Sequence, residues 1–266
     1  MLVIIRGGGD LASGVAVRLV RCGLRVAITE LAQPLAVRRS VSFAEAIYTG
    51  ETTIEGLTGQ RVTDASDSLR ILSIFAKQRL PVIVDPGCLS ARALFPSVIV
   101  DARMTKRSPE QIGYVPQVYI GLGPGFVAGQ NCQAAVETRR GSMLGRVFWQ
   151  GGPQSDTGLP DGDPARVLRA PASGEVVTQA AIGEHVEAGQ PIAEVNGQTI
   201  QAPFAGVVRG LIKSGLAVSQ GMKIGDIDPR DDPSLCQIVS DKALAIGGGV
   251  LEVILSKPEL RLKFWT

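Results

Sequence analysis

A glycine-rich turn near the start of the chain has the residue types that hold phosphate groups. Gly7, Gly9 and Ala12 follow the pattern Gly-x-Gly-x-x-Ala after the apolar run 3–5, and Glu30 ends the next such run. In a dinucleotide-binding turn the first glycine makes a tight bend, the second lets the backbone approach a diphosphate, and the third small residue allows close helix packing. The acidic residue accepts hydrogen bonds from a ribose. The pattern predicts a nucleotide-type ligand here; the alternative is an inherited turn without one.

Asp10 and Gly14 lie within the same segment. A carboxylate beside a diphosphate repels it, so Asp10 argues against simple binding of NAD. Asp10 is expected either to cap the helix that follows or to hold a metal ion or a donor group at the phosphates. Gly14 is expected among the residues that bind the cofactor.

Polar residues at later strand ends form a second candidate set. Ligands of open α/β sheets bind at the carboxyl ends of the strands, where an aspartate can bind a metal, act as a base or simply cap a helix. A basic stretch over 101–107 could meet phosphate, and four glycines within 121–129 could expose amides to an anion. An arginine after these glycines could clamp an acidic ligand. The expected ligand rim comprises Asp85, Asp101, Lys106, Gly123, Gly125 and Arg139.

Alternating apolar runs and helical patterns must position these residues. Runs at 3–5, 25–30, 81–85, 97–101 and 118–120 read as buried strands, and residues 11–22 and 69–77 read as helices. Strand, turn, helix and strand within the first 30 residues make a βαβ unit with parallel strands. We therefore expect residues 1–150 to form a Rossmann-like doubly wound parallel sheet.

An internal repeat marks a second domain. Residues 170–176 recur as 202–208, and four further pairs share the same offset of 32 residues. We expect a linker at 151–165 and a small all-β barrel-sandwich at 166–228, which resembles biotinyl and lipoyl domains. Those domains carry their cofactor on a lysine in the hairpin between the two halves. Here the hairpin has Asn196-Gly197, and no lysine lies between Arg169 and Arg209, so neither biotin nor lipoate is expected.

The tail at 229–266 is expected to pack on the first domain. Residues 241–246 read as helix, whereas 250–255 fit either helix or strand. Three successive glycines at 247–249 are unfavourable in a helix interior and indicate a close packing surface or a ligand loop.

Composition excludes several classes of function. The 266 residues include 27 basic and 25 acidic residues and 5% aromatics, so no broad basic field or stacking platform for nucleic acid exists. The only histidine, His185, lies in the repeat and is expected at its surface, which removes histidine-based triads and metal sites from the first domain. The four cysteines form no Cys-x-x-Cys pair, and no apolar run reaches membrane-spanning length. We expect a cytoplasmic protein without nucleic-acid or membrane partners.

Motifs along nearly the whole chain point to one family. They include Gly-Gly-Gly-Asp-Leu-Ala-Ser-Gly at 7–14, Gly-Leu-Gly-Pro-Gly-Phe at 121–126, Lys-Ile-Gly-Asp-Ile-Asp-Pro-Arg at 223–230 and Ser-Asp-Lys-Ala-Leu-Ala-Ile-Gly-Gly-Gly-Val-Leu-Glu at 240–252. This order resembles the accessory proteins of the selenium-dependent molybdenum hydroxylase system, of the YqeB type. One departure is Ser142, where members of the family often have histidine.

The resemblance implies an accessory or maturation factor for a xanthine dehydrogenase-like molybdenum hydroxylase. The hydroxylase or its maturation machinery would be the partner, and the ligand would be a dinucleotide such as molybdopterin dinucleotide. Two alternatives stay open: an NAD-dependent oxidoreductase with an appended β domain, in which Lys106 serves as acid or base, and a non-enzymatic interaction scaffold. No catalytic residue is assigned, and no metal site is expected.

Overall fold

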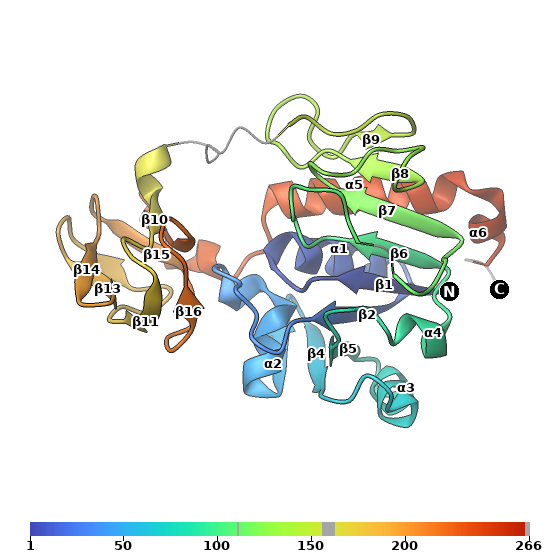
Figure 1. Cartoon of the computed structure of the whole chain (residues 1–266), viewed down its shortest axis with the longest axis horizontal. Coiled ribbons are helices and arrows are strands. Elements are labelled where there is room, and N and C mark those ends of the chain that lie inside the picture. Colours follow the sequence, from blue (N-terminus) through green and yellow to red (C-terminus); the bar gives the residue numbers. More distant parts are fainter. Residues whose placement is uncertain (111, 156–162, 264–266) are drawn as a thin grey trace. The chain divides into compact units, whose positions relative to one another are not determined.

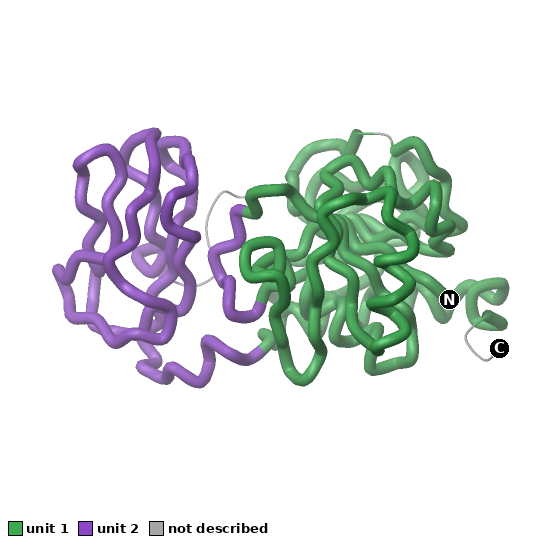
Figure 2. Tube along the Cα trace, turned by 90° about the horizontal axis from the view of Figure 1, so that it is seen from below, with its two compact units in different colours: residues 1–34, 42–157, 239–266 green, residues 35–41, 158–238 purple. Residues whose placement is uncertain are grey.

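The computed structural model describes residues 1–110, 112–155 and 163–263. The chain divides into two compact units, coloured in Figure 2. Unit 1 comprises residues 1–34, 42–157 and 239–266, and unit 2 comprises residues 35–41 and 158–238. Unit 1 is mixed α/β and unit 2 is an antiparallel β domain (Figure 1).

A nine-stranded sheet forms the centre of unit 1, in the order β3-β4-β5-β2-β1-β6-β7-β8-β9. The seven strands from β4 to β8 in this order pair in parallel, and β3 and β9 pair antiparallel at the two edges. The predicted parallel-rich α/β sheet is confirmed in this form. The strands are β1 (Leu2–Arg6), β2 (Arg25–Glu30), β3 (Glu51–Ile54), β4 (Leu57–Val62), β5 (Leu80–Val84), β6 (Val98–Asp101), β7 (Val118–Leu122), β8 (Ala134–Val136) and β9 (Val147–Phe148).

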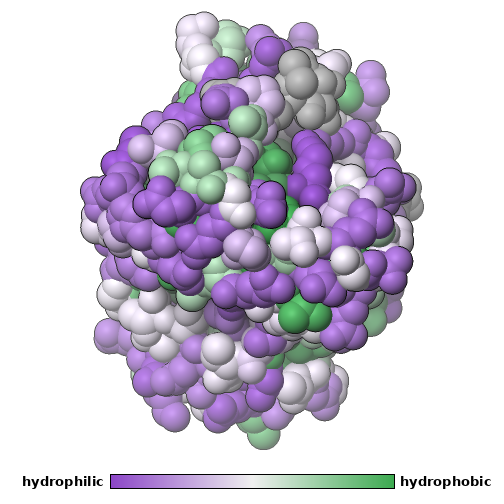
Figure 3. All heavy atoms as spheres, turned by 90° about the vertical axis from the view of Figure 1, so that its left-hand side faces the viewer, coloured by the Kyte–Doolittle hydropathy of each residue, from purple (hydrophilic) through white to green (hydrophobic). Residues whose placement is uncertain are grey.

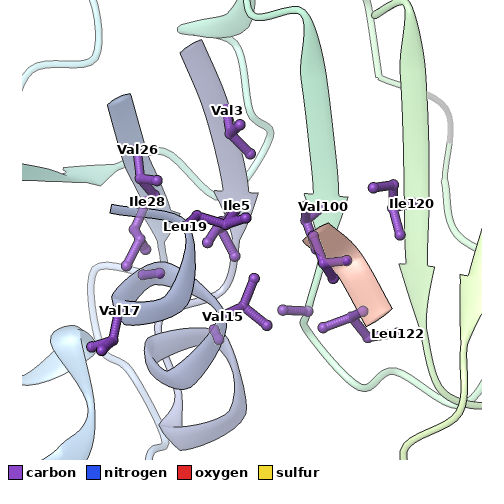
Figure 4. Close-up of a cluster of buried hydrophobic side chains, with 14 of the residues drawn as sticks. Val3, Ile5, Val15, Val17, Leu19, Val26, Ile28, Val100, Ile120 and Leu122 are labelled. Atoms are coloured by element: carbon purple, nitrogen blue, oxygen red, sulfur yellow. The ribbon is translucent and has the colours of Figure 1, made fainter. Parts of the chain in front are cut away.

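Helices cover both faces of this sheet. Val3 and Ile5 of β1 pack in a buried cluster with α1 (Asp10–Arg21) and α5 (Asp241–Ser256), part of which is drawn in Figure 4. Ile4, the residue between them, packs with α3 (Ser68–Ala76) and α4 (Ala91–Leu94) on the other face. Because both faces are buried, the strands read as continuous apolar runs in the sequence. The short helices α2 (Ala46–Thr49) and α6 (Pro258–Leu262) complete unit 1.

The contact between α1 and α5 depends on glycines. A Cβ at Gly14 of α1 would lie 2.4 Å from Cβ of Ala243, and a Cβ at Gly247 would lie 3.0 Å from Cβ of Arg18. The helix α5 runs through all three glycines at 247–249 and on to Ser256, so of the two alternatives for 250–255 the structure shows the helix. Close packing against α1 outweighs the low helix propensity of glycine.

Two interlocked halves form unit 2. One four-stranded sheet has the order β10-β17-β15-β12, and the other has the order β14-β13-β11-β16. The short strand β12 of the first repeat pairs with β15 of the second, and β16 of the second pairs with β11 of the first. The strands are β10 (Val167–Arg169), β11 (Gly174–Thr178), β12 (His185–Val186), β13 (Pro191–Val195), β14 (Gln198–Gln201), β15 (Gly206–Leu211), β16 (Ala217–Val218) and β17 (Lys223–Asp228).

A short excursion of the N-terminal part of the chain also belongs to unit 2. The backbone N–H of Leu211 donates to the carbonyl of Val37, and the hydroxyl of Ser40 donates to the carbonyl of Cys236. Residues 35–41 therefore belong with β15 and not with the first domain, where the sequence analysis placed them. Residues 229–238 also fall in unit 2. Part of the expected linker, 156–162, lies outside the described residues.

The surface carries few large apolar side chains on unit 2. Among its described residues, those exposed are Leu35, Val177 and Ile238. In the face drawn in Figure 3, hydrophilic residues predominate and hydrophobic ones are scattered. Among the described residues, no helix has the length and hydrophobicity needed to cross a membrane.

Two glycine-to-alanine changes test the helix contact. Gly14→Ala should destabilise unit 1 by about 1–3 kcal/mol, because the added Cβ overpacks the contact with Ala243. Gly248→Ala should stabilise it by about 0.5–1 kcal/mol, because a Cβ there meets no atom within 4 Å and alanine favours the helix. Denaturant unfolding of both variants measures the difference. Equal stability of the two would contradict the tight α1–α5 contact.

Candidate functional site

The glycine turn after β1 is tied to three neighbouring segments through Gly8. The N–H of Gly8 donates to Oε2 of Glu30 over 2.6 Å, and its carbonyl accepts from the N–H of Ala44 over 2.9 Å. The hydroxyl of Ser13, on α1, donates to the same carbonyl over 3.3 Å. A Cβ at Gly8 would lie 2.9 Å from the nitrogen of Ala44, so the fold itself requires glycine here.

Gly7 and Gly9 differ in what the fold demands of them. Gly7 has φ +90°, and a Cβ there would lie 3.3 Å from Cγ of Arg103. Gly9 has φ −65° and ψ −178°, which any residue adopts, and a Cβ there would meet no atom within 4 Å. Neither strain nor packing within the described chain explains glycine at position 9.

Gly9 is also the N-cap of α1, and it offers no side chain to the first amides of the helix. Asp10 is the first helical residue, so the expectation that it caps the helix was wrong. Ala12, on α1, is 1% exposed and packs in the buried cluster that joins this helix to the sheet.

Gly14 does not belong to the turn. Its position against Ala243 and Val239 accounts for the glycine without any ligand. Sequence reasoning could not separate it from the glycines of the turn, because its packing partner Ala243 lies more than 200 residues away in the chain.

Glu30 is half-buried beside the turn. Its Oε2 accepts from Gly8, and its Oε1 accepts from the N–H of Leu31 over 2.7 Å. Burial raises the pKa of the Glu30 carboxyl, and these two hydrogen bonds oppose the rise. Each oxygen keeps one further acceptor position, so the carboxylate can hold the turn in place and still accept a hydroxyl.

Asp101, at the end of β6, is buried and hydrogen-bonded to side chains of the protein itself. It is 0% exposed, and its Oδ2 accepts from Arg6 over 3.2 Å, from Arg103 over 2.7 Å and from the hydroxyl of Tyr119 over 2.7 Å. The expected role of Asp101 at the ligand rim does not fit this arrangement. A buried carboxylate needs such partners, and here they take the lone pairs that a ligand would use.

Arg6, Arg103, Tyr119 and Glu110 were missed as members of this cluster. Glu110 accepts from Nη2 of Arg6 over 2.8 Å and from Nη1 of Arg103. The hydrogen bond from Arg103 holds the pKa of the Glu110 carboxyl at about 2. Arg103 was present in the predicted basic stretch, whereas Arg6 ends an apolar run and gave no signal.

Asp85, after β5, shapes its own loop. Its Oδ1 accepts from the N–H of Leu89 and its Oδ2 from the N–H of Ser90, both over 2.8 Å, and it is 3% exposed. Both amides lie before α4, whose N-cap is Ser90, so Asp85 holds its own loop together. The ligand role of Asp85 stays a prediction. The loop also contains Cys88, whose φ is +56° and whose thiol has a pKa raised to about 11 by burial.

The second glycine loop is explained by packing. Gly123 has φ +76°, and its N–H donates to the carbonyl of Val136 over 3.0 Å. Gly125 has φ +98°, and a Cβ there would lie 2.4 Å from the carbonyl oxygen of Arg107. These positions do not form the expected anion nest, because the Gly123 amide is already bonded and Gly125 faces the neighbouring loop. Lys106, in that loop, is exposed with φ +62°.

Arg139 lies on a surface loop beside a buried glutamate. Its guanidinium donates to Gln154 over 3.2 Å. Glu137, which is 0% exposed, accepts from the backbone N–H groups of Thr138, Arg139 and Gln154, each over 2.8 Å. Glu137 thus organises the loop that carries Arg139, a role that the sequence analysis did not assign.

The parallel strands bring these groups to one edge of the sheet, and the glycine turn and Arg103 are in direct contact there. No group of three or more histidine, cysteine, aspartate or glutamate residues that could hold a metal ion occurs in the part of the chain that the structure describes.

In unit 2, the hairpin between β13 and β14 turns at Asn196 and Gly197, with φ +51° and +74°. Positive φ at both residues matches the expected two-residue turn. His185 is exposed, and its Nε2 lies 2.6 Å from Oδ1 of Asp231. The hairpin carries no lysine.

Two comparisons place this architecture among known proteins. Residues 166–227 match the family model of the biotin-requiring enzyme domain. The chain is 43% identical over 258 residues to the uncharacterized protein YqeB of Escherichia coli strain K12. That match covers 96% of this chain and 47% of YqeB, so the chain spans about half the length of this curated relative. Together they support the YqeB-type resemblance with its biotin/lipoyl-like domain.

Solved structures give weaker similarity. An aspartoacylase family protein from Mesorhizobium loti is 14% identical with a TM-score of 0.28, over 85% of this chain and 84% of that one. A succinylglutamate desuccinylase from Silicibacter is 13% identical with a TM-score of 0.26, over the same shares. Such TM-scores support no conclusion on fold or function.

The missing lysine leads to a prediction about modification. Protein isolated from its native host should have the mass of the bare chain, because Asn196-Gly197 replaces the modified lysine of the carrier domains. Intact-mass spectrometry measures this. A lipoyl or biotinyl adduct on any lysine of 166–228 would contradict it.

Proposed function

We propose that unit 1 binds a nucleotide-type ligand whose diphosphate lies against the backbone of Gly9 at the start of α1. The observation that carries this proposal is the glycine at position 9, which neither φ nor packing explains. A ligand that approaches the backbone closely explains it. The first amides of α1 and the helix dipole then favour the negative charge of the phosphates.

The strand order supports the same position. From β1 the sheet continues through β2 and β5 in one direction and through β6, β7 and β8 in the other. This order is compatible with the proposed Rossmann-like fold, in which ligands bind at the carboxyl edge where the order reverses. The Gly7–Gly9 turn follows β1 at that point, and Glu30 at the end of β2 is in reach of a ribose.

The ligand-bearing protein acts as an accessory factor in the maturation of a molybdenum hydroxylase. The support is the resemblance of the chain to the YqeB type, together with the absence of an evident triad or metal cluster among the described residues. A molybdopterin dinucleotide fits both parts of the proposal: it is a cofactor of such hydroxylases, and it carries a diphosphate that the glycine turn could bind. The barrel-sandwich of unit 2 then serves to dock the hydroxylase or to present the ligand.

Ligand binding is tested by thermal shift with NAD, CTP and ATP. A ligand that binds the wild-type protein should add about 2.7 kcal/mol at 100 times its dissociation constant. Gly9→Asp should abolish the shift at unchanged intrinsic stability, because the site is open but a carboxylate there repels phosphate. Gly248→Ala should keep the shift and serves as the matched control. Equal shifts for Gly9→Asp and wild type would show that the turn does not contact the ligand.

The maturation role is tested in the native host. Deletion of the gene should leave the hydroxylase polypeptide present but inactive, because the defect lies in the cofactor and not in the fold. Gly9→Asp should restore activity poorly, because it also blocks the ligand, whereas Gly248→Ala should restore it fully. A deletion strain with fully active hydroxylase would refute this role. Steady NADH turnover by the purified protein, lost in Gly9→Asp, would favour the oxidoreductase alternative.

A further inference from the structure

Two arginine side chains at the carboxyl edge of the sheet converge on one carboxylate oxygen. Arg6 and Arg103 both donate to Oε1 of Glu110. Arg6 is 1% exposed, and its Nε has no hydrogen-bond partner among the described residues. The Glu110 side chain is 60% exposed. A buried cation and a half-buried one are thus aimed at a group that enters from the solvent side.

Glu110 lies on residues 102–110, the strap, which follows β6 and contains no helix or strand. The strap contacts both glycine loops, since Arg103 packs on Gly7 and the backbone of Arg107 packs on Gly125. Met104 and Lys106 have φ +55° and +62°. Residues with side chains adopt this left-handed region at an energetic cost, so the strap is held in place by its contacts.

Two carboxylates, one buried and one exposed, pair with the two arginines. Asp101, at 0% exposure, pairs with both arginines inside the fold. Glu110 supplies the second negative charge from an exposed position. Guanidinium groups that converge on one point favour the oxygens of a phosphate, which offers more acceptors than a carboxylate.

We propose that Arg6 and Arg103 form a phosphate site, and that Glu110 fills it as an internal stand-in until a ligand phosphate displaces it. The site adjoins the glycine turn through the contact between Arg103 and Gly7, so the proposal rests on the proposed function for the identity of the full ligand. Displacement requires no covalent step. The exposed Glu110 side chain turns away from the two guanidinium groups, while Arg103 stays in place through its hydrogen bonds to Asp101.

The test is the binding of inorganic pyrophosphate to the full chain, measured by calorimetry at low ionic strength. Glu110→Gln keeps the size of the side chain but removes the competing charge. It should bind pyrophosphate about fivefold more tightly than wild type, the ratio that corresponds to one unit charge at roughly 4 Å in water. Adding Arg103→Gln to this variant should remove the gain. Glu51→Gln, which removes a similarly exposed carboxylate from its ion pair with Arg79, is the matched control and should leave affinity unchanged.

Equal affinities of wild type and Glu110→Gln, including no binding by either, would overturn the inference. So would a gain that survives Arg103→Gln or appears equally in Glu51→Gln. Tighter pyrophosphate binding by Glu110→Gln without any shift by NAD, CTP or ATP would uphold this site and refute the nucleotide proposal. Nucleotide binding that depends on Gly9 but not on Glu110 would uphold the nucleotide proposal and refute this phosphate site.

Discussion

The backbone of Gly8 is the point on which the carboxyl edge of unit 1 depends. Its N–H is bonded to Glu30 and its carbonyl to Ala44 and Ser13, so the end of β1 is joined to β2, α1 and the chain that returns at residue 42. A buried peptide group without such partners costs about 1–3 kcal/mol, which makes these bonds obligatory. They fix the turn in one conformation. Within this fixed turn, Gly9 is the glycine at which the described chain leaves room for a Cβ.

The charged residues around this turn follow a second constraint. The sheet is buried on both faces, so a charge at a strand end must find its partner within the fold. Asp101 finds Arg6, Arg103 and Tyr119, and Asp85 finds two backbone amides of its own loop. These two carboxylates at strand ends, which the sequence suggested for ligand binding, thus accept hydrogen bonds from the protein itself. The guanidinium groups of Arg6 and Arg103 also face the exposed carboxylate of Glu110, which lies between them and the solvent.

The sequence predicted the elements that depend on local pattern and missed the contacts that depend on distant ones. Continuous apolar runs identified the central strands, and the 32-residue repeat identified the halves of unit 2, because both signals are written within short segments. Glycine was ambiguous, since Gly9, Gly14 and Gly125 look alike, but only the partner atoms separate an open backbone from a packed one. Arg6 gave no signal in the sequence, because its partner Asp101 is 95 residues away. The pairing of 35–41 with β15 had no local signal.

The same distant pairing bears on what unit 2 does. A domain that carries a covalently bound cofactor between sites needs a flexible connection to the rest of its chain. Here the chain passes between the two units at four points, after residues 34, 41, 157 and 238. Residues 35–41 cannot leave unit 2 without breaking the bonds of Val37 and Ser40 to Leu211 and Cys236. The passage also lies between Glu30 and Ala44, the two residues that hold Gly8. The four connections and the missing lysine argue against a swinging carrier.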